Sequence, residues 1–218
     1  MINRDIKAVL LDLDGTLLDT MPDLVRAHNF CLRSLGFPEL TEEEMAKCIG
    51  EGIITAIELA CPPGTPRDKI MEYHSIYSNK YGNECTVYTR HFPGMVEFLS
   101  RCVSAGKKVA VLTNKTEPIA QKIVRHYFPD VPFSFIWGNN NVRPLKPKPD
   151  AGLMAAEELS IEPQNIAYVG DSDVDIYFAK NCGMLAVGAS WGYRGREELV
   201  QAGADLVLDS PEQLLALI

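Results

Sequence analysis

The chain has 218 residues, which is long for a single domain and short for two full ones, so we expect a core domain that carries a smaller insertion. Hydrophobic residues make up 46% and charged residues 23% of the sequence, a balance typical of folded globular proteins that excludes an intrinsically disordered chain. The net charge of -8 argues against binding to nucleic acid, whose phosphates are bound by clustered Lys and Arg, but is compatible with a small anionic substrate where a metal ion reverses the local field.

The sequence contains no apolar run of the ~18 residues that a membrane-spanning helix needs. The N-terminal stretch MINRDIKAVL lacks the apolar segment and cleavage site of a secretory signal, so we expect a cytoplasmic protein. The six cysteines are scattered without a C-x-x-C pair, which indicates neither a disulfide framework nor a zinc site. We expect them to be reduced and mostly buried.

The first predicted element is a buried strand at residues 6–11, and it is followed by an interval, about 20–88, without a convincing strand. The patterns in this interval are helical. The stretch PDLVRAHNFCLRSLG predicts a helix that ends at Gly36. One face of that helix would carry Leu24, Val25, His28, Cys31, Leu32 and Leu35.

From residue 93 onward, predicted helices and strands alternate. The helices are expected at 93–105, 116–127, 150–159, 173–182 and 196–202, and the strands at 108–114, 133–138, 166–171, 184–190 and 204–209. Most of these strands are apolar throughout, which is typical of parallel strands covered on both faces. The alternation predicts an α/β fold with a doubly wound, Rossmann-like parallel sheet.

The position of the helical interval predicts the domain organisation. We expect an α/β core domain made of residues 1–19 and 89–218, and an all-helical cap domain made of residues 20–88. Two short hinges near Asp19 and Arg90 would join the two domains, since the sequence has no long linker there.

Polar side chains follow several predicted strands at their carboxyl ends, where an open parallel sheet binds its ligands. The residues that we expect to converge there are Asp12, Asp14, Thr113, Asn114, Lys146, Asp171 and Asp175. Asp12 and Asp14 are separated by one residue and therefore point the same way from an extended strand. Gathered carboxylates repel one another, so the pattern predicts a hard divalent cation among them, and few protein ligands favour Mg²⁺ over Ca²⁺.

These residue types suit phosphoryl transfer. The carboxylate of Asp12 is ionised at neutral pH and could attack phosphorus to form an aspartyl phosphate. Asp14 could protonate the departing alkoxide and then activate the water that hydrolyses the intermediate. Lys146 and Mg²⁺ would neutralise charge on the transferring group, and the Thr113 hydroxyl would hold its oxygens.

Four motifs in this order resemble those of the haloacid dehalogenase superfamily of phosphatases: DLDGT at 12–16, LTN at 112–114, KPKP at 146–149 and GDSDVD at 170–175. The resemblance implies that Asp12 is the nucleophile, Asp14 the acid and base, and Thr113 and Lys146 the phosphate-binding residues. It also implies Mg²⁺ ligands and residues that orient them. The implied ligands are Asp12, the Asp14 main-chain carbonyl and Asp171, with Asp175 and Ser172 in support.

The chain is similar, within that superfamily, to the phosphoglycolate-phosphatase-like branch, through DGTLLDTMPDL, the IGEGI loop at 49–53 and SWGYRG near Trp191. The resemblance implies a small phosphorylated metabolite as substrate. The implied substrate contacts are Gly15, Thr16, Asn114, Gly50, Glu51 and Gly52. Glu51 departs from the pattern, because its carboxylate would stand where an anionic phosphoglycolate prefers a neutral or basic group.

Other functions are compatible with parts of the same pattern. A sugar-phosphate phosphatase, a pyrophosphatase, a phosphomutase or a phosphonate-cleaving enzyme could share the core, the last through a Schiff-base lysine for which Lys47 and Lys69 are the candidates. A phospho-aspartate receiver also combines strand-end acids with a Thr and a Lys, although it needs no helical insertion. The stretch CPPGTPR at 61–67 has the spacing of a cysteine-phosphatase loop, but its prolines lack the N–H donors that such a loop requires.

Further local interpretations concern helix starts and a histidine. We expect Asp173 to cap the helix that follows it, Thr41 to cap the helix that starts with the run EEE, and Asp19 and Thr20 to be hinge and N-cap residues. His28, on an apolar helix face, is expected to be a packed residue of the cap domain.

Overall fold

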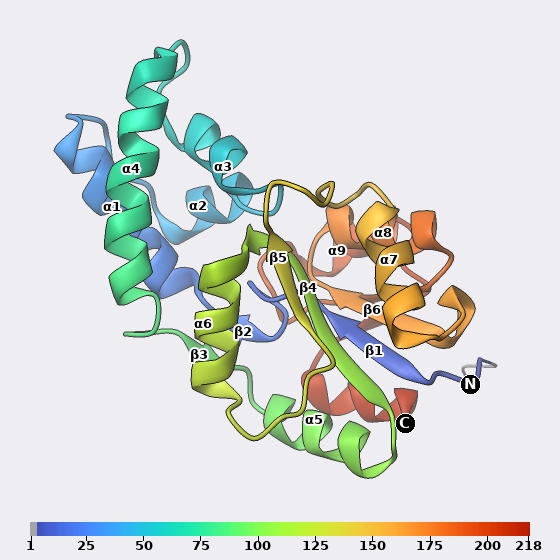
Figure 1. Ribbon diagram of the computed structural model, residues 1–218. Helices are drawn as coiled ribbons and strands as arrows, with labels where there is room; N and C mark the ends of the chain where they lie inside the picture. The colour runs from blue at the N-terminus through green and yellow to red at the C-terminus, as the bar shows by residue number, and fades with distance from the viewer. Residues whose placement is uncertain (1–3) are drawn as a thin grey trace.

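The computed structural model describes residues 4–218, and its centre is a six-stranded sheet in the order β5-β4-β1-β6-β7-β8 (Figure 1). The strands are β1 (Ala8–Leu11), β4 (Lys108–Thr116), β5 (Ile136–Asn139), β6 (Ile166–Gly170), β7 (Leu185–Ala189) and β8 (Leu206–Leu208). Every pairing in this sheet is parallel, which confirms the predicted α/β class. The chain begins in the middle of the sheet and fills first one side and then the other.

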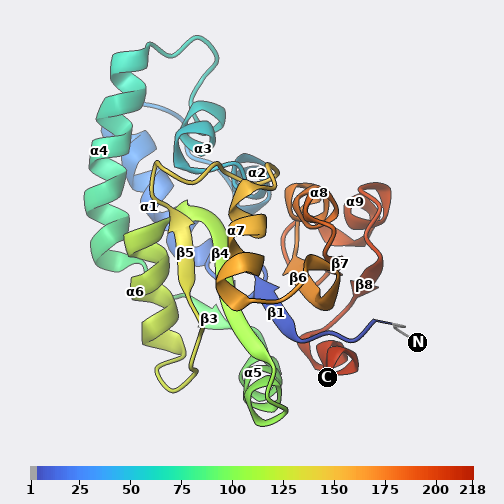
Figure 2. The same cartoon turned by 45° about the vertical axis from the view of Figure 1, so that its right-hand side comes forward.

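Helices cover both faces of the sheet (Figure 2). One face is covered by α5 (Met95–Ser104), α6 (Glu117–Tyr127) and the 3-10 helix η2 (Pro211–Leu217). The other is covered by α7 (Asp150–Leu159), α8 (Asp173–Cys182) and α9 (Gly195–Gln201), and a single 3-10 turn, η1 (Pro163–Asn165), precedes β6. The central strand β1 shows the arrangement, because Val9 and Leu11 pack with α5 and α6 while Ala8 and Leu10 pack with α7 and α8.

Four helices follow β1 in the sequence before the chain returns to the sheet. In space they lie to one side of the sheet (Figure 1). They are α1 (Met21–Ser34), α2 (Glu42–Cys48), α3 (Ile53–Ala60) and α4 (Arg67–Glu84). Helix α1 packs along α4, with Leu24, Cys31 and Tyr73 among the buried side chains of these helices. We refer to residues 20–88 as the cap, following the boundary predicted above; residues 1–3 of the predicted core segment lie outside the described residues.

A two-residue antiparallel pair joins the cap to the core. Strand β2 (Leu18–Asp19) pairs with β3 (Arg90–His91), with Leu18 opposite His91 and Asp19 opposite Arg90. The sequence pointed to hinges near Asp19 and Arg90 but did not predict that these two segments pair.

Element boundaries differ from the predicted ones at a few places. The strand expected at 133–138 begins only at Ile136, and the one expected at 204–209 is confined to Leu206–Leu208. The interpretation of Asp173 as a helix cap was wrong: Ser172 is the N-cap of α8, and its side chain and that of Asp175 form a reciprocal capping box. Thr41 caps α2 in the same way with Glu44, as predicted.

Two further observations agree with the sequence analysis. All six cysteines are free and buried, and residues 62–66 form a turn between α3 and α4. Within residues 4–218, none of the helices combines the length and the apolar character that crossing a membrane requires.

Candidate active site

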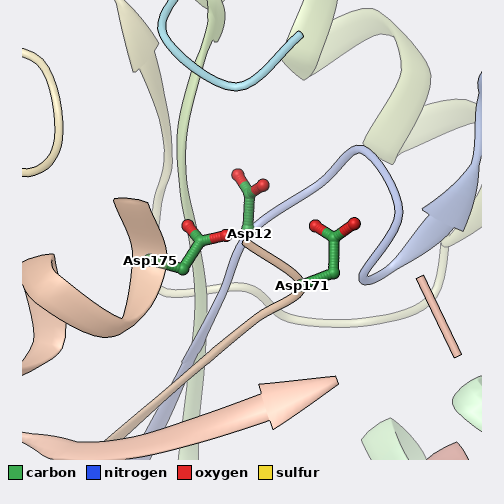
Figure 3. A group of neighbouring side chains, drawn as sticks. All are labelled: Asp12, Asp171 and Asp175. Atoms are coloured by element: carbon green, nitrogen blue, oxygen red, sulfur yellow. The ribbon is translucent and has the colours of Figure 1, made fainter. Parts of the chain in front are cut away.

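Three aspartates meet at the carboxyl ends of the central strands (Figure 3). Asp12 follows β1, Asp171 follows the neighbouring β6, and Asp175 lies in the first turn of α8. One carboxylate oxygen of each residue lies within 4.8 Å of the others, and all three side chains are buried. The topology accounts for this, because parallel neighbours end at the same edge of the sheet.

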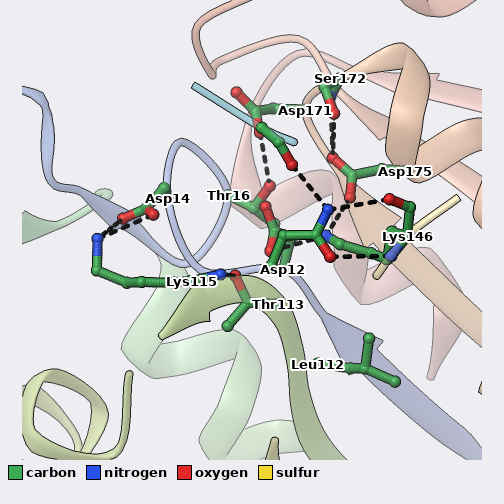
Figure 4. A network of polar contacts seen from close by, with 12 residues as sticks. Asp12, Asp14, Thr16, Leu112, Thr113, Lys115, Lys146, Asp171, Ser172 and Asp175 are labelled. Atoms are coloured by element: carbon green, nitrogen blue, oxygen red, sulfur yellow. Dashed lines mark hydrogen bonds and ion pairs between the residues drawn. The ribbon is translucent and has the colours of Figure 1, made fainter. Parts of the chain in front are cut away.

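Lys146 supplies the positive charge inside this group of acids. Its Nζ lies 2.9 Å from Asp12 Oδ1 and 2.6 Å from Asp175 Oδ1, and it donates to the Tyr168 hydroxyl at 2.8 Å (Figure 4). Its side chain is only 2% exposed. Burial alone would lower the pKa of Lys146, but the charges of Asp12 and Asp175 raise it above its ordinary value, so the lysine stays protonated.

The acids outnumber this one lysine. Burial, together with the charges of Asp175 and Asp14, raises the pKa of Asp12 to about 6 against the opposing effect of Lys146. Burial and the charges of Asp175 and Asp12 raise the pKa of Asp171 well above its usual range. The protein alone therefore stabilises the ionised forms of these two carboxylates poorly.

The oxygens of the three acids are not equally engaged. Asp175 Oδ1 accepts from Lys146, and its Oδ2 accepts from the Ser172 backbone N–H at 3.1 Å and hydroxyl at 2.7 Å. Asp171 Oδ2 accepts from the Tyr193 backbone N–H at 2.8 Å, and its Oδ1 has a longer contact of 3.3 Å with the Thr16 hydroxyl. Asp175 is thus fixed by hydrogen bonds, whereas Asp171 keeps one weakly bonded oxygen.

Asp12 has one buried oxygen that is incompletely bonded. Its Oδ1 meets no hydrogen-bond partner in good geometry within residues 4–218, and its one close polar neighbour is the Lys146 ammonium group at 2.9 Å. An unsatisfied carboxylate oxygen beside a second buried acid suits a small divalent ion with oxygen ligands. The donor set that the structure offers to such an ion is Asp12 and Asp171, with Asp175 held back by Lys146 and Ser172.

The second motif lies against the same group. Thr113 is buried and its hydroxyl accepts from the Lys115 backbone N–H at 3.3 Å. Asn114 uses its whole side-chain amide in local bonds: Oδ1 accepts from the Lys146 backbone N–H at 2.9 Å, and Nδ2 donates to the carbonyls of Gly50 and Lys146 at 2.9 and 3.1 Å. Asn114 therefore ties the Lys146 loop to the cap, and its side chain has little capacity left for a substrate.

Asp14 lies apart from the three buried acids, beside Lys115 (Figure 4). Both of its oxygens accept from Lys115 Nζ, at 2.8 and 2.9 Å, and its Oδ1 also accepts from the Thr20 hydroxyl at 2.6 Å. Its side chain is 20% exposed, so it borders the opening above the site. The expected hinge residue Thr20 is indeed the N-cap residue of α1, although its hydroxyl bonds to Asp14 and not to the helix.

Gly15 and Thr16 contact an aspartate directly. Gly15 has φ of +76°, and a Cβ built on it would lie 2.2 Å from Asp171 Oδ2. Thr16 donates to the same carboxylate. The resemblance implied substrate contacts for both residues, whereas the structure places them against Asp171.

A cavity opens between these residues and the cap, with about 750 Å³ of empty space including its mouth. Asp12, Asp14, Thr113 and Asn114 line it from the core. From the cap it is lined by Leu24, His28, Ala46, Ile49, Gly50, Gly52, Ile53, Ala56, Tyr77 and Tyr81.

The cap-loop residues 50–52 line two different cavities. Gly50 and Gly52 line the cavity above Asp12, but the exposed Glu51 does not and instead lines a neighbouring one. Glu51 therefore does not place its carboxylate among the residues that surround Asp12.

Lys115 and Tyr168 were not singled out by the sequence, and Tyr193 was noted only as part of the SWGYRG stretch. Lys115 binds Asp14, Tyr168 binds Lys146, and the Tyr193 hydroxyl accepts from the backbone N–H groups of Thr20 and Met21 at 2.8 and 3.0 Å. The sequence offers one sign that Lys115 belongs to the site, because it directly follows the Thr113-Asn114 motif.

The chain matches known proteins along most of its length. A family model described as haloacid dehalogenase-like hydrolase matches residues 9–189. A phosphoglycolate phosphatase from Nitrosospira multiformis is 32% identical over 98% of this chain and 96% of its own length, and one from Aquifex aeolicus is 32% identical over 98% and 97%. The crystal structure of a predicted phosphoglycolate phosphatase from Haemophilus somnus superimposes with a TM-score of 0.91 at 27% identity, covering 98% of each chain. The chain therefore belongs to the haloacid dehalogenase-like hydrolase family, as its four motifs predicted.

Proposed function

We propose that this protein is a Mg²⁺-dependent phosphatase of small phosphorylated metabolites, with phosphoglycolate as the first candidate, and that it works through an aspartyl phosphate in the cytoplasm. The observation that carries the proposal is the meeting of Asp12, Asp171 and Asp175 around Lys146 below a cavity. The names of the curated relatives support the choice of phosphoglycolate.

Asp12, Asp171 and the main-chain carbonyl of Asp14 would hold the Mg²⁺ ion. When bound, the ion supplies positive charge that neutralises the acids and the phosphate oxygens. Asp175 and Ser172 keep Lys146 in place, while Thr16 and the Tyr193 backbone N–H orient Asp171.

Asp12 acts as the nucleophile in this proposal. Its carboxylate oxygen attacks phosphorus, an O–P bond forms, and the bond from phosphorus to the leaving alkoxide breaks. Lys146, 2.9 Å from Asp12 and held protonated, lies where it can stabilise the charge of the transferring phosphoryl group. Thr113 lines the same cavity and offers its hydroxyl to a phosphoryl oxygen.

Asp14 would carry the protons of both half-reactions. It donates a proton to the leaving oxygen in the first step, and in the second it takes a proton from the water that attacks phosphorus, which releases phosphate and restores the Asp12 carboxylate. Asp14 borders the opening of the site, between the nucleophile and the cap, where the leaving group would lie. The cap would exclude bulk water during these steps.

The structure gives no support to the phosphonate-cleaving alternative. Lys47 and Lys69 are exposed on the cap, paired with Glu43 and Glu72, and neither lines a cavity. A Schiff-base lysine needs a desolvated setting that lowers its pKa, which these two positions do not provide.

A phosphate-release assay tests the proposal. We expect turnover of phosphoglycolate in the presence of Mg²⁺, loss of that turnover with a chelator, and a fall in kcat of at least about 1,000-fold in Asp12→Asn. Asp130→Asn, which changes an exposed aspartate outside the cavity, is the matched control and should retain wild-type kcat. Activity that survives in Asp12→Asn would exclude Asp12 as the nucleophile. Turnover of sugar phosphates or pyrophosphate without turnover of phosphoglycolate would exclude phosphoglycolate as the substrate.

A further inference from the structure

We propose that Lys115 binds the anionic group of the leaving group, and that in the substrate-free enzyme the carboxylate of Asp14 occupies the place of that group. The inference rests on the proposed phosphatase function and assigns a residue to the selection of substrates with a carboxylate. It concerns the end of the cavity that faces the cap, away from Lys146.

The position of Lys115 fits this role. It follows Thr113 and Asn114 near the end of β4, lines the cavity, and has a side chain that is only 7% exposed. Its Nζ lies 2.8 and 2.9 Å from the two oxygens of Asp14, so the site already receives a carboxylate through both oxygens. The ring of Tyr81 lies under the ammonium group, with the centroid at 4.6 Å.

The other cations near the cavity are engaged elsewhere. Among the residues that line the cavity in the described chain, Arg194 is the only other cation, and it bonds to the Ile49 carbonyl at 3.2 Å and pairs with Glu198 at 3.8 Å. Lys146 is held by the buried acids below. Lys115, in contrast, is held by a carboxylate that the reaction needs for proton transfer.

The cap offers further unpaired polar atoms to the same cavity. The Tyr81 hydroxyl and His28 Nε2 are buried and find no hydrogen-bond partner among residues 4–218, although both residues line the cavity. The Tyr73 hydroxyl lies 3.1 Å from the His28 carbonyl and 2.8 Å from Nδ1, and both contacts are satisfied when Tyr73 donates to the carbonyl and Nδ1–H donates to Tyr73. Nε2 is then an acceptor and the Tyr81 hydroxyl a donor, which suits a small polar group.

An exchange of ion pairs follows from this geometry. A carboxylate on the leaving group would take over Lys115 Nζ, and Asp14 would lose its partner and become available to the leaving oxygen. The exchange itself leaves every bond between heavy atoms intact; the released Asp14 carboxylate takes up a proton from solvent and then donates it to the leaving oxygen. A substrate with an uncharged leaving group would leave Asp14 on Lys115, so Lys115 would favour carboxylate-bearing substrates in both binding and turnover.

The test compares phosphoglycolate with 2-hydroxyethyl phosphate, which has a similar size and an uncharged leaving group. In the wild type we expect kcat/KM for phosphoglycolate to exceed that for 2-hydroxyethyl phosphate by at least about tenfold; equal values would overturn the proposal without any variant. Lys115→Met should reduce this preference by about 10- to 100-fold, the usual range for a lost charged hydrogen bond. Lys115→Arg should keep most of it.

The matched control is Lys69→Met, which removes an exposed cap lysine that lines neither cavity and should keep the wild-type preference. A Lys115→Met preference within twofold of the wild type would overturn the proposal while leaving the phosphatase function intact.

A binding measurement separates this inference from the proposed function. Calorimetry on Asp12→Asn and on Asp12→Asn/Lys115→Met gives the affinity for phosphoglycolate without turnover. We expect the double variant to bind phosphoglycolate about 10- to 100-fold more weakly and 2-hydroxyethyl phosphate with little change. Equal losses for both ligands would contradict the inference. Absence of phosphate release from every substrate in the wild type would instead overturn the proposed function, and the calorimetric comparison would still decide the role of Lys115.

Discussion

Single residues at the site show how little room the backbone has around the buried acids. Gly15 turns away directly after Asp14 with φ of +76°, and its Cα faces Asp171 so closely that a Cβ would lie 2.2 Å from Oδ2. Both features require glycine, since an L residue avoids positive φ and no side-chain atom fits at that distance. The glycine therefore fixes the separation between the first motif and Asp171.

We predict that Gly15→Ala weakens Mg²⁺ binding at least about tenfold, because Asp171 must move to accommodate the methyl group. Gly106→Ala is the matched control: Gly106 has a similar φ of +72° but nothing within 4 Å of the position that a Cβ would take, so it should cost only the backbone strain, about 1 kcal/mol. Calorimetric Mg²⁺ titration and urea denaturation measure the two effects. Equal Mg²⁺ affinities in the two variants would contradict the assigned role of Gly15.

The site could be predicted from sequence as far as strand ends determine it. Asp12 and Asp171 could be placed together because they follow buried strands that belong side by side in a parallel sheet. Lys115 was missed because the role proposed for it depends on a contact with Tyr81 in α4, far away in sequence. Glu51 was expected to contact the substrate, but it lines the neighbouring cavity. The direction of a side chain in a loop cannot be predicted from the sequence, because loop backbones lack a regular period.

Among the elements, helix α8 has the most direct effect on the site. Its N-cap Ser172 and its third residue Asp175 form the capping box, and the same Asp175 holds Lys146 at 2.6 Å. The capping box at the start of α8 thus also positions Lys146 between the acids.

We predict that Ser172→Ala costs about 1 kcal/mol of unfolding free energy and lowers kcat about tenfold or more, because Asp175 loses a bond that orients it toward Lys146. Thr41→Ala removes the equivalent cap from α2. Thr41 itself is exposed and does not line the cavity, so the change should cost a similar free energy while leaving kcat unchanged. Denaturation curves and steady-state kinetics on both variants separate the two effects. A parallel loss of kcat in both would show that it reflects stability alone.

The elements of the sheet were largely readable in the sequence, because continuous apolar strands and amphipathic helices differ in period. The pair of β2 and β3 was not, since two residues are too few to show the alternation of a strand. It joins Asp19 to Arg90, which are far apart in the sequence and become neighbours only in the folded chain.

For the protein as a whole, the buried acids would link the proposed Mg²⁺ binding to pH. The pKa of Asp12 is raised to about 6 from an ordinary value of 3.8, and that of Asp171 is raised as well, so the metal-free protein holds protons that the ion must displace. We predict that the affinity for Mg²⁺ falls by about tenfold or more per pH unit below pH 6, as measured by calorimetry in buffers of different ionisation enthalpy. A pH-independent affinity between pH 5 and 7 would contradict the prediction.

The raised pKa of Asp12 also determines whether the unfolding free energy rises or falls with pH. Between about pH 4 and 6 the metal-free folded protein binds more protons at Asp12 than the unfolded chain does, so its unfolding free energy falls as pH rises through that window. Asp12→Asn should lessen this slope and be more stable than the metal-free wild type at pH 7, by on the order of 1 kcal/mol or more. Thermal unfolding in the presence of a chelator measures the difference.

The antiparallel pair of Leu18–Asp19 with Arg90–His91 gives the chain a modular construction. Because Asp19 and Arg90 are direct neighbours across the pair, everything threaded between them starts and finishes at one place on the core. A turn of two residues is enough to close such a pair. The intervening helices could therefore be exchanged for other sequences during evolution, or replaced by a tight turn in the laboratory, without shifting the ends that the sheet domain has to hold.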